Sequence, residues 1–186
     1  VLHLDDIARH PLRAKLSGVF DCERVSEDPL LFGMPALTAV PHSRYNEVSE
    51  DALAAKGYRI LRRLPHRGVD LFTRQSRSLF IFQQGHPEYD SETLGREYCR
   101  DFGCFLRGER GARPAIPENY FDAATEAAIA ELADCEAEPD LLARMVRRVS
   151  AAAPIQSWRS DAVTFFTNWL RFVANEKSRR AARHGR

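Results

Sequence analysis

The sequence predicts a single domain of the α/β class, in which strands and helices alternate along the chain. Its 186 residues include 44% apolar side chains, which is enough to bury one sizeable core and too few to fill two. Short apolar runs rich in β-branched and aromatic residues, which are typical of strands, lie between stretches with helical periodicity. The sequence shows no internal repeat and no low-complexity tract.

The first forty residues are expected to form the end of a helix and two strands. Residues 1–12 indicate a helix that ends before Pro11, because a proline disfavours helical geometry in the residue before it. Residues 15–20 and 36–40 are short apolar runs, and we interpret each of them as a strand. The second run ends at Pro41, so the polar residues that follow are expected beyond the end of that strand.

A short helix and three strands are expected next. Residues 49–57 predict the helix, because a serine can cap it, acids occupy its first turn and a glycine closes it. Residues 58–64, 69–74 and 78–84 are rich in β-branched and aromatic side chains, as strands are. The polar sequence QSRS between the last two strands favours a hairpin turn.

A helix should follow the last strand. It is expected to begin at Asp90 or Ser91 and to run to about Phe102, since a short polar side chain precedes it and apolar residues recur at intervals of four. Gly103 is expected to close this helix. The proline-rich residues 112–121 are interpreted as an extended linker.

The C-terminal part is predicted to be helical. Residues 122–136 and 139–153 are amphipathic, and together they resemble an α-hairpin insertion over 122–153. Residues 160–177 carry apolar side chains around most of the helical circumference, so we expect this helix to be buried on two sides. The basic tail, 177–186, has no apolar face and is expected to be solvated and disordered.

Charge and composition exclude several classes of function. Lys and Arg number 27 against 26 Asp and Glu, so the net charge of +1 provides no field that would hold a nucleic acid or a membrane surface. There is no apolar run that could cross a bilayer and no signal-peptide pattern, and we therefore expect a soluble cytoplasmic protein. No metal site is predicted, because no C-x-x-C pair or nearby histidine accompanies the cysteines, which are interpreted as reduced thiols: Cys22, Cys99, Cys104 and Cys135.

The segment GHPEYD contains the candidate catalytic residues. An apolar run over residues 79–82 stops at Gly85, and His86 and Glu88 follow at once. In open α/β sheets, functional groups gather where strands reach their carboxyl ends. A histidine followed two residues later by a carboxylate has the composition of a general base and its orienting partner. The alternative interpretation is an ordinary surface turn.

A dyad of this kind needs a nucleophile, which the sequence does not readily supply. Catalytic cysteines usually lie at a sharp strand-to-helix turn among small residues, where the thiolate is exposed. The four cysteines have other surroundings and are interpreted as packing or surface thiols. Ser43 is the only serine next to a strand end with basic neighbours.

Five segments together resemble the homoserine O-succinyltransferase family, the acyl-CoA-dependent transferases of methionine biosynthesis. They are KLSGVF, VPHSRY, GHPEYD, PENYF and SWRSDAVTFFTNWL, and they span nearly the whole chain in the expected order. The resemblance implies a three-layer flavodoxin-like or glutamine-amidotransferase-like sheet flanked by helices. The helical insertion expected over 122–153, near the C-terminus, is a departure that the resemblance does not cover. The resemblance further implies a homodimer, and it makes residues 1–186 one acyltransferase domain that is the C-terminal part of a longer chain.

The resemblance also implies roles for five residues. In that family a cysteine takes the acyl group from the CoA thioester and passes it to the hydroxyl of an amino acid. Carried over by motif, His86 would be the catalytic base and Glu88 its orienting carboxylate. Arg100 matches the position that binds the carboxylate of the acceptor, which suits a bidentate guanidinium. Lys15 and Ser43 match active-site positions whose roles are less settled. The nucleophilic cysteine would fall a few residues upstream of the sequence.

The implied function is that of an acyl-CoA:L-homoserine O-acyltransferase without a bound cofactor, with succinyl-CoA favoured over acetyl-CoA as co-substrate. L-serine, as used in cysteine biosynthesis, is an alternative acceptor, because it differs by one methylene, which a pocket discriminates by only about 1–3 kcal/mol. A glutamine amidotransferase-like hydrolase, which uses the same Cys-His-Glu set, is a second alternative. A non-catalytic binding subunit is the third.

Overall fold

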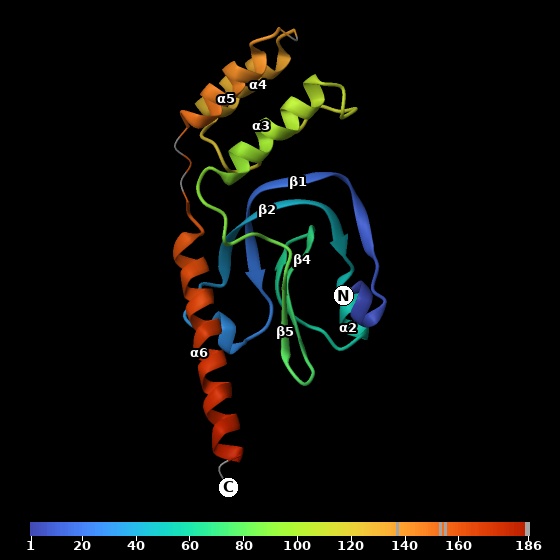
Figure 1. Ribbon diagram of the computed structural model, residues 1–186, viewed down its shortest axis with the longest axis vertical. Helices are drawn as coiled ribbons and strands as arrows, with labels where there is room; N and C mark the ends of the chain where they lie inside the picture. The colour runs from blue at the N-terminus through green and yellow to red at the C-terminus, as the bar shows by residue number, and fades with distance from the viewer. Residues whose placement is uncertain (137, 153, 155, 185–186) are drawn as a thin grey trace.

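Five strands form a curled sheet at the centre of the protein (Figure 1). The computed structural model describes residues 1–136, 138–152, 154 and 156–184. The strands are β1 (Arg9–Arg24), β2 (Leu37–Val48), β3 (Arg59–Leu64), β4 (Gly68–Gln75) and β5 (Leu79–Gln83). Their order in the sheet is β2-β1-β3-β4-β5, and each neighbouring pair is antiparallel. The predicted α/β class is confirmed, since six α-helices accompany this sheet in the described part of the chain.

The N-terminal segment differs from the expectation of a helix that ends before Pro11, and that prediction was wrong. The only helix there is α1 (Leu2–Asp5), and β1 begins at Arg9. Pro11 lies within β1 opposite Asn46, just before the register of the pairing with β2 shifts. A strand tolerates a proline beside such an irregularity, because a missing N–H costs least there.

The second strand is also longer than expected, because β2 does not end at Pro41. It continues to Val48, so the polar residues that follow the proline lie on the strand itself. Pro41 is opposite Val19, whose N–H donates to the carbonyl of Glu118. β2 is an edge strand, where a residue without an N–H is tolerated.

The predictions for residues 49–84 are confirmed. Helix α2 (Glu50–Ala55) is capped by Ser49, whose hydroxyl accepts the N–H of Ala52, and Gly57 follows with φ at 75°. β4 and β5 form the predicted antiparallel hairpin. Helix α2 and the strands that follow it share an apolar cluster, in which the rings of Tyr58 and Phe72 pack edge to face.

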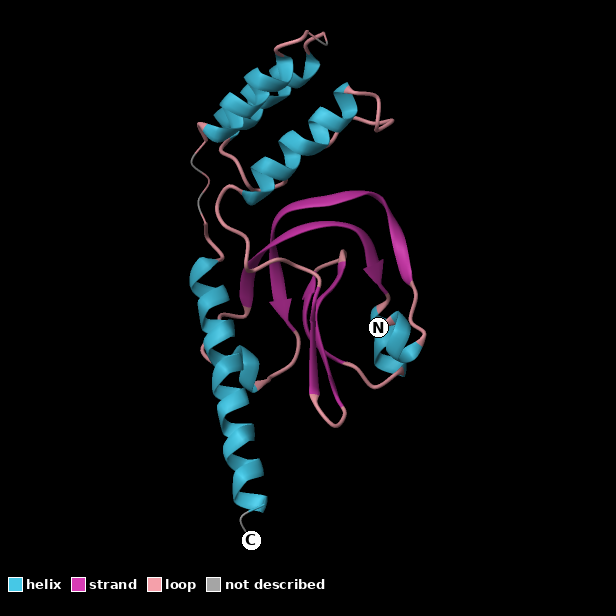
Figure 2. Ribbon diagram, in the orientation of Figure 1, coloured by secondary structure: helices cyan, strands magenta, loops and turns pink. Residues whose placement is uncertain are grey.

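Three helices, α3 (Thr93–Leu106), α4 (Ala123–Asp134) and α5 (Leu141–Ser150), lie together at one end of the sheet (Figure 2). The two helices predicted for 122–153 are confirmed, although residues 137 and 153 lie outside the described residues. The predicted end of α3 at Gly103 was wrong, because the helix runs on to Leu106. Gly103 instead leaves space for Leu142 of α5, which would lie 3.3 Å from an added Cβ.

The last helix, α6 (Arg159–His184), runs alongside the sheet (Figure 1). The predicted burial on two sides was wrong, since Val163, Phe166 and Leu170 are about half exposed, at 51, 53 and 50%. The expected disorder of the tail was also wrong as far as His184, because alanine and arginine are strong helix formers; residues 185 and 186 lie outside the described residues. Among the described residues, no helix is long and apolar enough to cross a membrane.

Candidate functional site

His86 and Glu88 form the pair that the sequence predicted. The Nδ1 atom of His86 and the Oε1 atom of Glu88 are 2.8 Å apart. In the described part of the chain, Nε2 of His86 has no hydrogen-bond partner, and the side chain is 34% exposed. The ring of Tyr89 stacks on the imidazole, with centroids 4.4 Å apart and planes 11° apart. When Nδ1–H donates to the carboxylate, Nε2 is left as an accessible proton acceptor.

The backbone that carries His86 is held from two sides. The N–H of Gly85 donates to Oδ1 of Asp70 on β4 at 3.1 Å. The N–H of His86 donates to the carbonyl of Pro41 on β2 at 2.7 Å. Gly85 has no room for a side chain, because an added Cβ would lie 2.7 Å from Oδ1 of Asp70 and 2.9 Å from Nε2 of His42. The two hydrogen bonds and the close packing at Gly85 therefore hold the turn after β5 against β2 and β4.

Asp70 is a fully buried, charged anchor for this turn. Nε of Arg62 donates to its Oδ2 atom at 2.7 Å, and Nε2 of His42 lies 3.3 Å from Oδ1. Burial alone would raise the pKa of Asp70, but the charge of Arg62 and the hydrogen bond from His42 outweigh it and lower the pKa to about 2. The ionised carboxylate thus joins β2, β3, β4 and the turn before His86.

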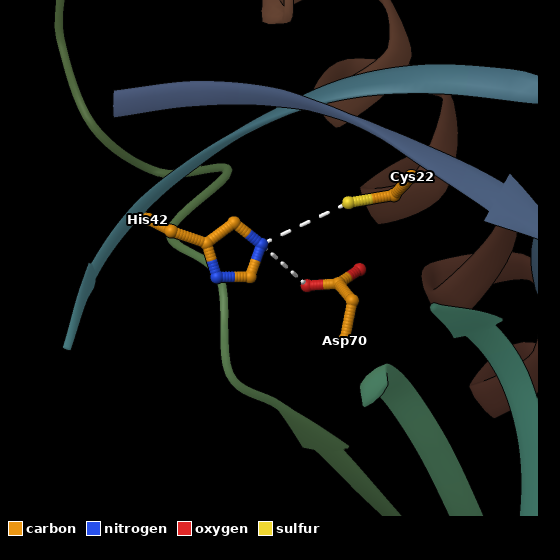
Figure 3. A group of neighbouring side chains, drawn as sticks. All are labelled: Cys22, His42 and Asp70. Atoms are coloured by element: carbon orange, nitrogen blue, oxygen red, sulfur yellow. Dashed lines mark hydrogen bonds and ion pairs between the residues drawn. The ribbon is translucent and has the colours of Figure 1, made fainter. Parts of the chain in front are cut away.

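Cys22 completes a buried group with His42 and Asp70, as Figure 3 shows. These residue types also occur in catalytic triads and in metal sites. A triad, however, needs the nucleophile and the acid on different ring nitrogens, whereas Sγ of Cys22, at 3.8 Å, and Asp70 both face Nε2 of His42. The carboxylate already accepts hydrogen bonds from Arg62 and Gly85. We therefore interpret the group as structural.

The protonation of this buried group supports the same interpretation. Burial, together with the charge of Asp70, raises the pKa of the Cys22 thiol, which therefore stays protonated at neutral pH. Burial lowers the pKa of His42. A neutral, fully enclosed thiol is neither a nucleophile nor a ready metal ligand.

The three predicted binding residues meet at α3. Nζ of Lys15 donates to Oδ2 of Asp101 at 2.8 Å and lies 3.5 Å from Oε2 of Glu97. The hydroxyl of Ser43 donates to the same Glu97 oxygen. Arg100 donates to Oδ1 of Asp101 through two of its nitrogens, at 3.0 and 3.1 Å. Residues from β1, β2 and α3 thus converge on two carboxylates.

Glu97 connects this group to the histidine. The hydroxyl of Tyr89 donates to Oε1 of Glu97 at 3.2 Å, and the ring of Tyr89 stacks on His86. Burial and the charge of Glu97 raise the pKa of Tyr89 to about 12, so it remains a hydrogen-bond donor at neutral pH. All five residues singled out in the sequence consequently share one connected network.

Sequence reasoning missed Glu97, Asp101 and Tyr89. One signal was present, because Glu97 and Asp101 are four residues apart and so lie on the same face of a helix. Like charges at this spacing destabilise an isolated helix, which indicates cations from elsewhere in the fold. Lys15 of β1 is such a cation, and Arg100, on α3 itself, supplies a second positive charge. Burial alone would raise the pKa of Asp101, but hydrogen bonds from the two cations outweigh it and lower the pKa.

Two cavities adjoin the site. The larger, of about 540 Å³, lies between β5 and α6, is mostly apolar and is bounded by Pro87 and Glu88. The smaller, of about 250 Å³, lies between β1 and α3 and is lined by charged side chains, including Lys15 and Asp101. Glu88 thus borders the first cavity, whereas Lys15 and Asp101 line the second.

Comparisons with known proteins agree on one family. The family model described as homoserine O-succinyltransferase matches residues 1–179. The chain is 48% identical over 178 residues to the homoserine O-succinyltransferase of Methylorubrum extorquens, covering 94% of this chain and 54% of that protein. It is 47% identical over 179 residues to the protein of the same name from Rhodopseudomonas palustris, covering 95% and 54%.

A more distant relative bears a different name. A homoserine O-acetyltransferase of Methanomethylophilus alvi is 33% identical over 173 residues, covering 92% of this chain and 46% of that protein. The chain therefore spans about half the length of the curated relatives that it matches.

Proposed function

The chain belongs to the homoserine O-succinyltransferase family, and from this premise we propose that the protein is an acyl-CoA:L-homoserine O-acyltransferase of methionine biosynthesis. Succinyl-CoA is the favoured donor, because the relatives at 47 and 48% identity are named succinyltransferases. The acetyltransferase name belongs to a relative at 33% identity. The observation that carries the proposal is the His86–Glu88 pair, whose free Nε2 faces away from the carboxylate.

In this proposal His86 moves the protons in both halves of the reaction. Nε2 takes the proton of a cysteine thiol, whose sulfur attacks the thioester carbonyl, and the departing CoA thiolate receives that proton. In the second half, Nε2 takes the proton of the homoserine hydroxyl, whose oxygen attacks the acyl-enzyme thioester. The cysteine thiolate then leaves and is reprotonated by the imidazolium. Glu88 holds the tautomer and stabilises the positive charge that forms on the ring.

The proposal requires a nucleophilic cysteine outside these 186 residues, and the chain spans only 54% of the relative from Methylorubrum extorquens. Among the described residues, Cys22 is fully buried. Cys99 and Cys104 lie within α3, and Cys135 follows α4. None of the four has the exposed strand-to-helix turn that activates a thiol.

The acceptor would bind beside α3. Arg100 is 60% exposed in its side chain and can donate two parallel hydrogen bonds to the carboxylate of homoserine. Glu97 lies 3.8 Å from Arg100 and offers a negative charge for the ammonium group of the same molecule. Ser43 and Lys15 orient Glu97. An α-amino acid carries these two charges on one carbon, so the adjacent arginine and glutamate match its head group.

The test is release of free CoA by the whole protein from succinyl-CoA and homoserine. His86→Ala should lower kcat by at least about 100-fold, since a general base contributes that much or more. His3→Ala is the matched control, because His3 is exposed on α1, and it should leave kcat unchanged. Equal turnover by wild type and His86→Ala would refute the assignment of the base.

We also propose that the protein is cytoplasmic and forms a homodimer. The half-exposed apolar side chains of α6, including Val163 and Phe166, support association with a second surface, because large apolar patches are rare on monomers.

A further inference from the structure

The smaller cavity, of about 250 Å³, has several charged side chains in its wall. It lies between β1, the end of α3 and the segment that follows α3. The rings of Tyr45 and Tyr98 form part of the wall. Four cations also line it, namely Arg13, Lys15, Arg110 and Arg113, while Asp101 is the only acid in the lining among the residues that the structure describes.

Asp134, which does not line the cavity, pairs with Arg113, but the nearby acids do not neutralise the other three cations. Oδ2 of Asp101 accepts a hydrogen bond from Nζ of Lys15 at 2.8 Å and lies 3.3 Å from Nη1 of Arg110. Oδ1 of Asp101 accepts a hydrogen bond from Arg100. The carboxylate of Asp101 thus pairs with three cations, and Glu97, 3.5 Å from Lys15, adds a second negative charge. Even with Asp101 ionised, Arg13, Lys15, Arg100 and Arg110 outnumber Asp101 and Glu97, so the region keeps a surplus of positive charge.

The two cations deepest in this wall are fixed in place. Nζ of Lys15 and the guanidinium of Arg110 lie 5.7 and 5.8 Å from the centroid of Tyr45, so one aromatic ring holds both. Their side chains are 10 and 23% exposed. Charges that are this far removed from water are weakly screened and attract an anion strongly.

We propose that this cavity binds an anionic group of the acyl donor, either a phosphate of CoA or the distal carboxylate of the succinyl group. The inference rests on the proposed function, since it names a subsite for that reaction. At about 250 Å³ the cavity is below the usual range for whole ligands and suits one anionic group. Arg100, assigned above to the acceptor, does not line it.

The cavity is also connected to the candidate base. Lys15, in its wall, lies 3.5 Å from Glu97, which accepts a hydrogen bond from Tyr89. Tyr89 stacks on His86. A donor anchored through its anion would therefore lie next to the residues that surround the imidazole.

The test measures dissociation constants of the whole protein for CoA, pantetheine and succinate by titration calorimetry. Arg110→Gln should weaken binding of the anionic probe roughly tenfold, as expected for the loss of one charge-assisted hydrogen bond. Arg110→Lys keeps the charge and should stay within about threefold of wild type. Arg107→Gln is the matched control, because Arg107 pairs with Glu109 and does not line the cavity.

The three dissociation constants distinguish a phosphate of CoA from the succinyl carboxylate. If Arg110→Gln weakens CoA and spares pantetheine, the anion is a phosphate; if it weakens succinate and spares CoA, the anion is the carboxylate. If it leaves all three constants within about twofold of wild type, or if Arg107→Gln has the same effect, the subsite is refuted. Wild type that binds a probe through Arg110 but releases no CoA from succinyl-CoA and homoserine would refute the proposed reaction and leave the subsite standing.

Discussion

At the scale of single residues, the position of His86 depends on a charge buried beneath it. The carboxylate of Asp70 is fully enclosed and is paired with Arg62 at 2.7 Å. It also accepts the N–H of Gly85, the residue before the histidine. Burying two charges is costly, but removing one of them is worse, because the other is left without a partner.

We predict that Asp70→Asn lowers the free energy of unfolding of the whole protein by about 3–5 kcal/mol at pH 7, because Arg62 keeps its charge in the core. The pKa of Asp70, about 2, lies below its ordinary value, so its ionisation stabilises the fold above about pH 4. That contribution is lost as the pH falls from about 4 to about 2, and the difference between wild type and variant should narrow over the same window.

Urea unfolding at a series of pH values measures this difference. Asp134→Asn is the matched control, since Asp134 pairs with Arg113 at the surface, and it should change the unfolding free energy by less than about 1 kcal/mol. A pH-independent gap between wild type and Asp70→Asn would contradict the account.

The same residues show what local sequence can and cannot reveal. His86 and Glu88 are two positions apart, so their pairing could be predicted from the sequence. Asp70 lies 16 positions before His86, and no spacing rule connects an aspartate on one strand with a turn after the next. The structure alone brings it under Gly85.

At the scale of elements, α3 is the helix on which the candidate site is built. One face carries Leu94 and Phe102 into a core shared with α4 and α5. Another face carries Glu97 and Asp101 toward Lys15. The helices α4 and α5 thus support the element that presents the binding residues, a role that the sequence did not suggest.

We predict that Met145→Ala lowers the unfolding free energy by about 2–5 kcal/mol, because Met145 is fully buried in the core between α3 and α5. Amide hydrogen exchange in α3 should also become faster, since the helix loses a packing partner. Val146→Ala, at the neighbouring position of α5, is the control; Val146 is 42% exposed, and the change should stay within about 0.5 kcal/mol. Unchanged exchange in α3 would show that α5 does not support it.

The boundaries of elements were harder to predict than their existence. Pro41 suggested the end of a strand, but edge position lets β2 pass through it, and the topology of a sheet is not visible in a single segment. The apolar side chains of α6 suggested burial, yet several remain half exposed. The length of β2 and the exposure of α6 both depend on which elements lie next to them in space, and a local stretch of sequence does not show this.

At the scale of the whole molecule, the candidate site joins segments that are far apart in the sequence. Lys15 comes from β1, Ser43 from β2, His86 from the turn after β5 and Arg100 from α3. The rule that predicted a site at the strand end concerns open α/β sheets, whereas the five described strands pair antiparallel. The predicted residues nevertheless come together in the structure, because an abrupt change from apolar to ionisable residues marks the rim of either kind of sheet.

The central claim is that His86 activates a cysteine that carries the acyl group. Mass spectrometry of the whole protein, mixed with succinyl-CoA and no acceptor, tests it most directly. The account predicts one succinyl group on a cysteine, added far more slowly in His86→Ala and removed by homoserine, at a residue other than Cys22, Cys99, Cys104 or Cys135. Turnover without any such adduct, or an adduct that forms equally fast in His86→Ala, would contradict it.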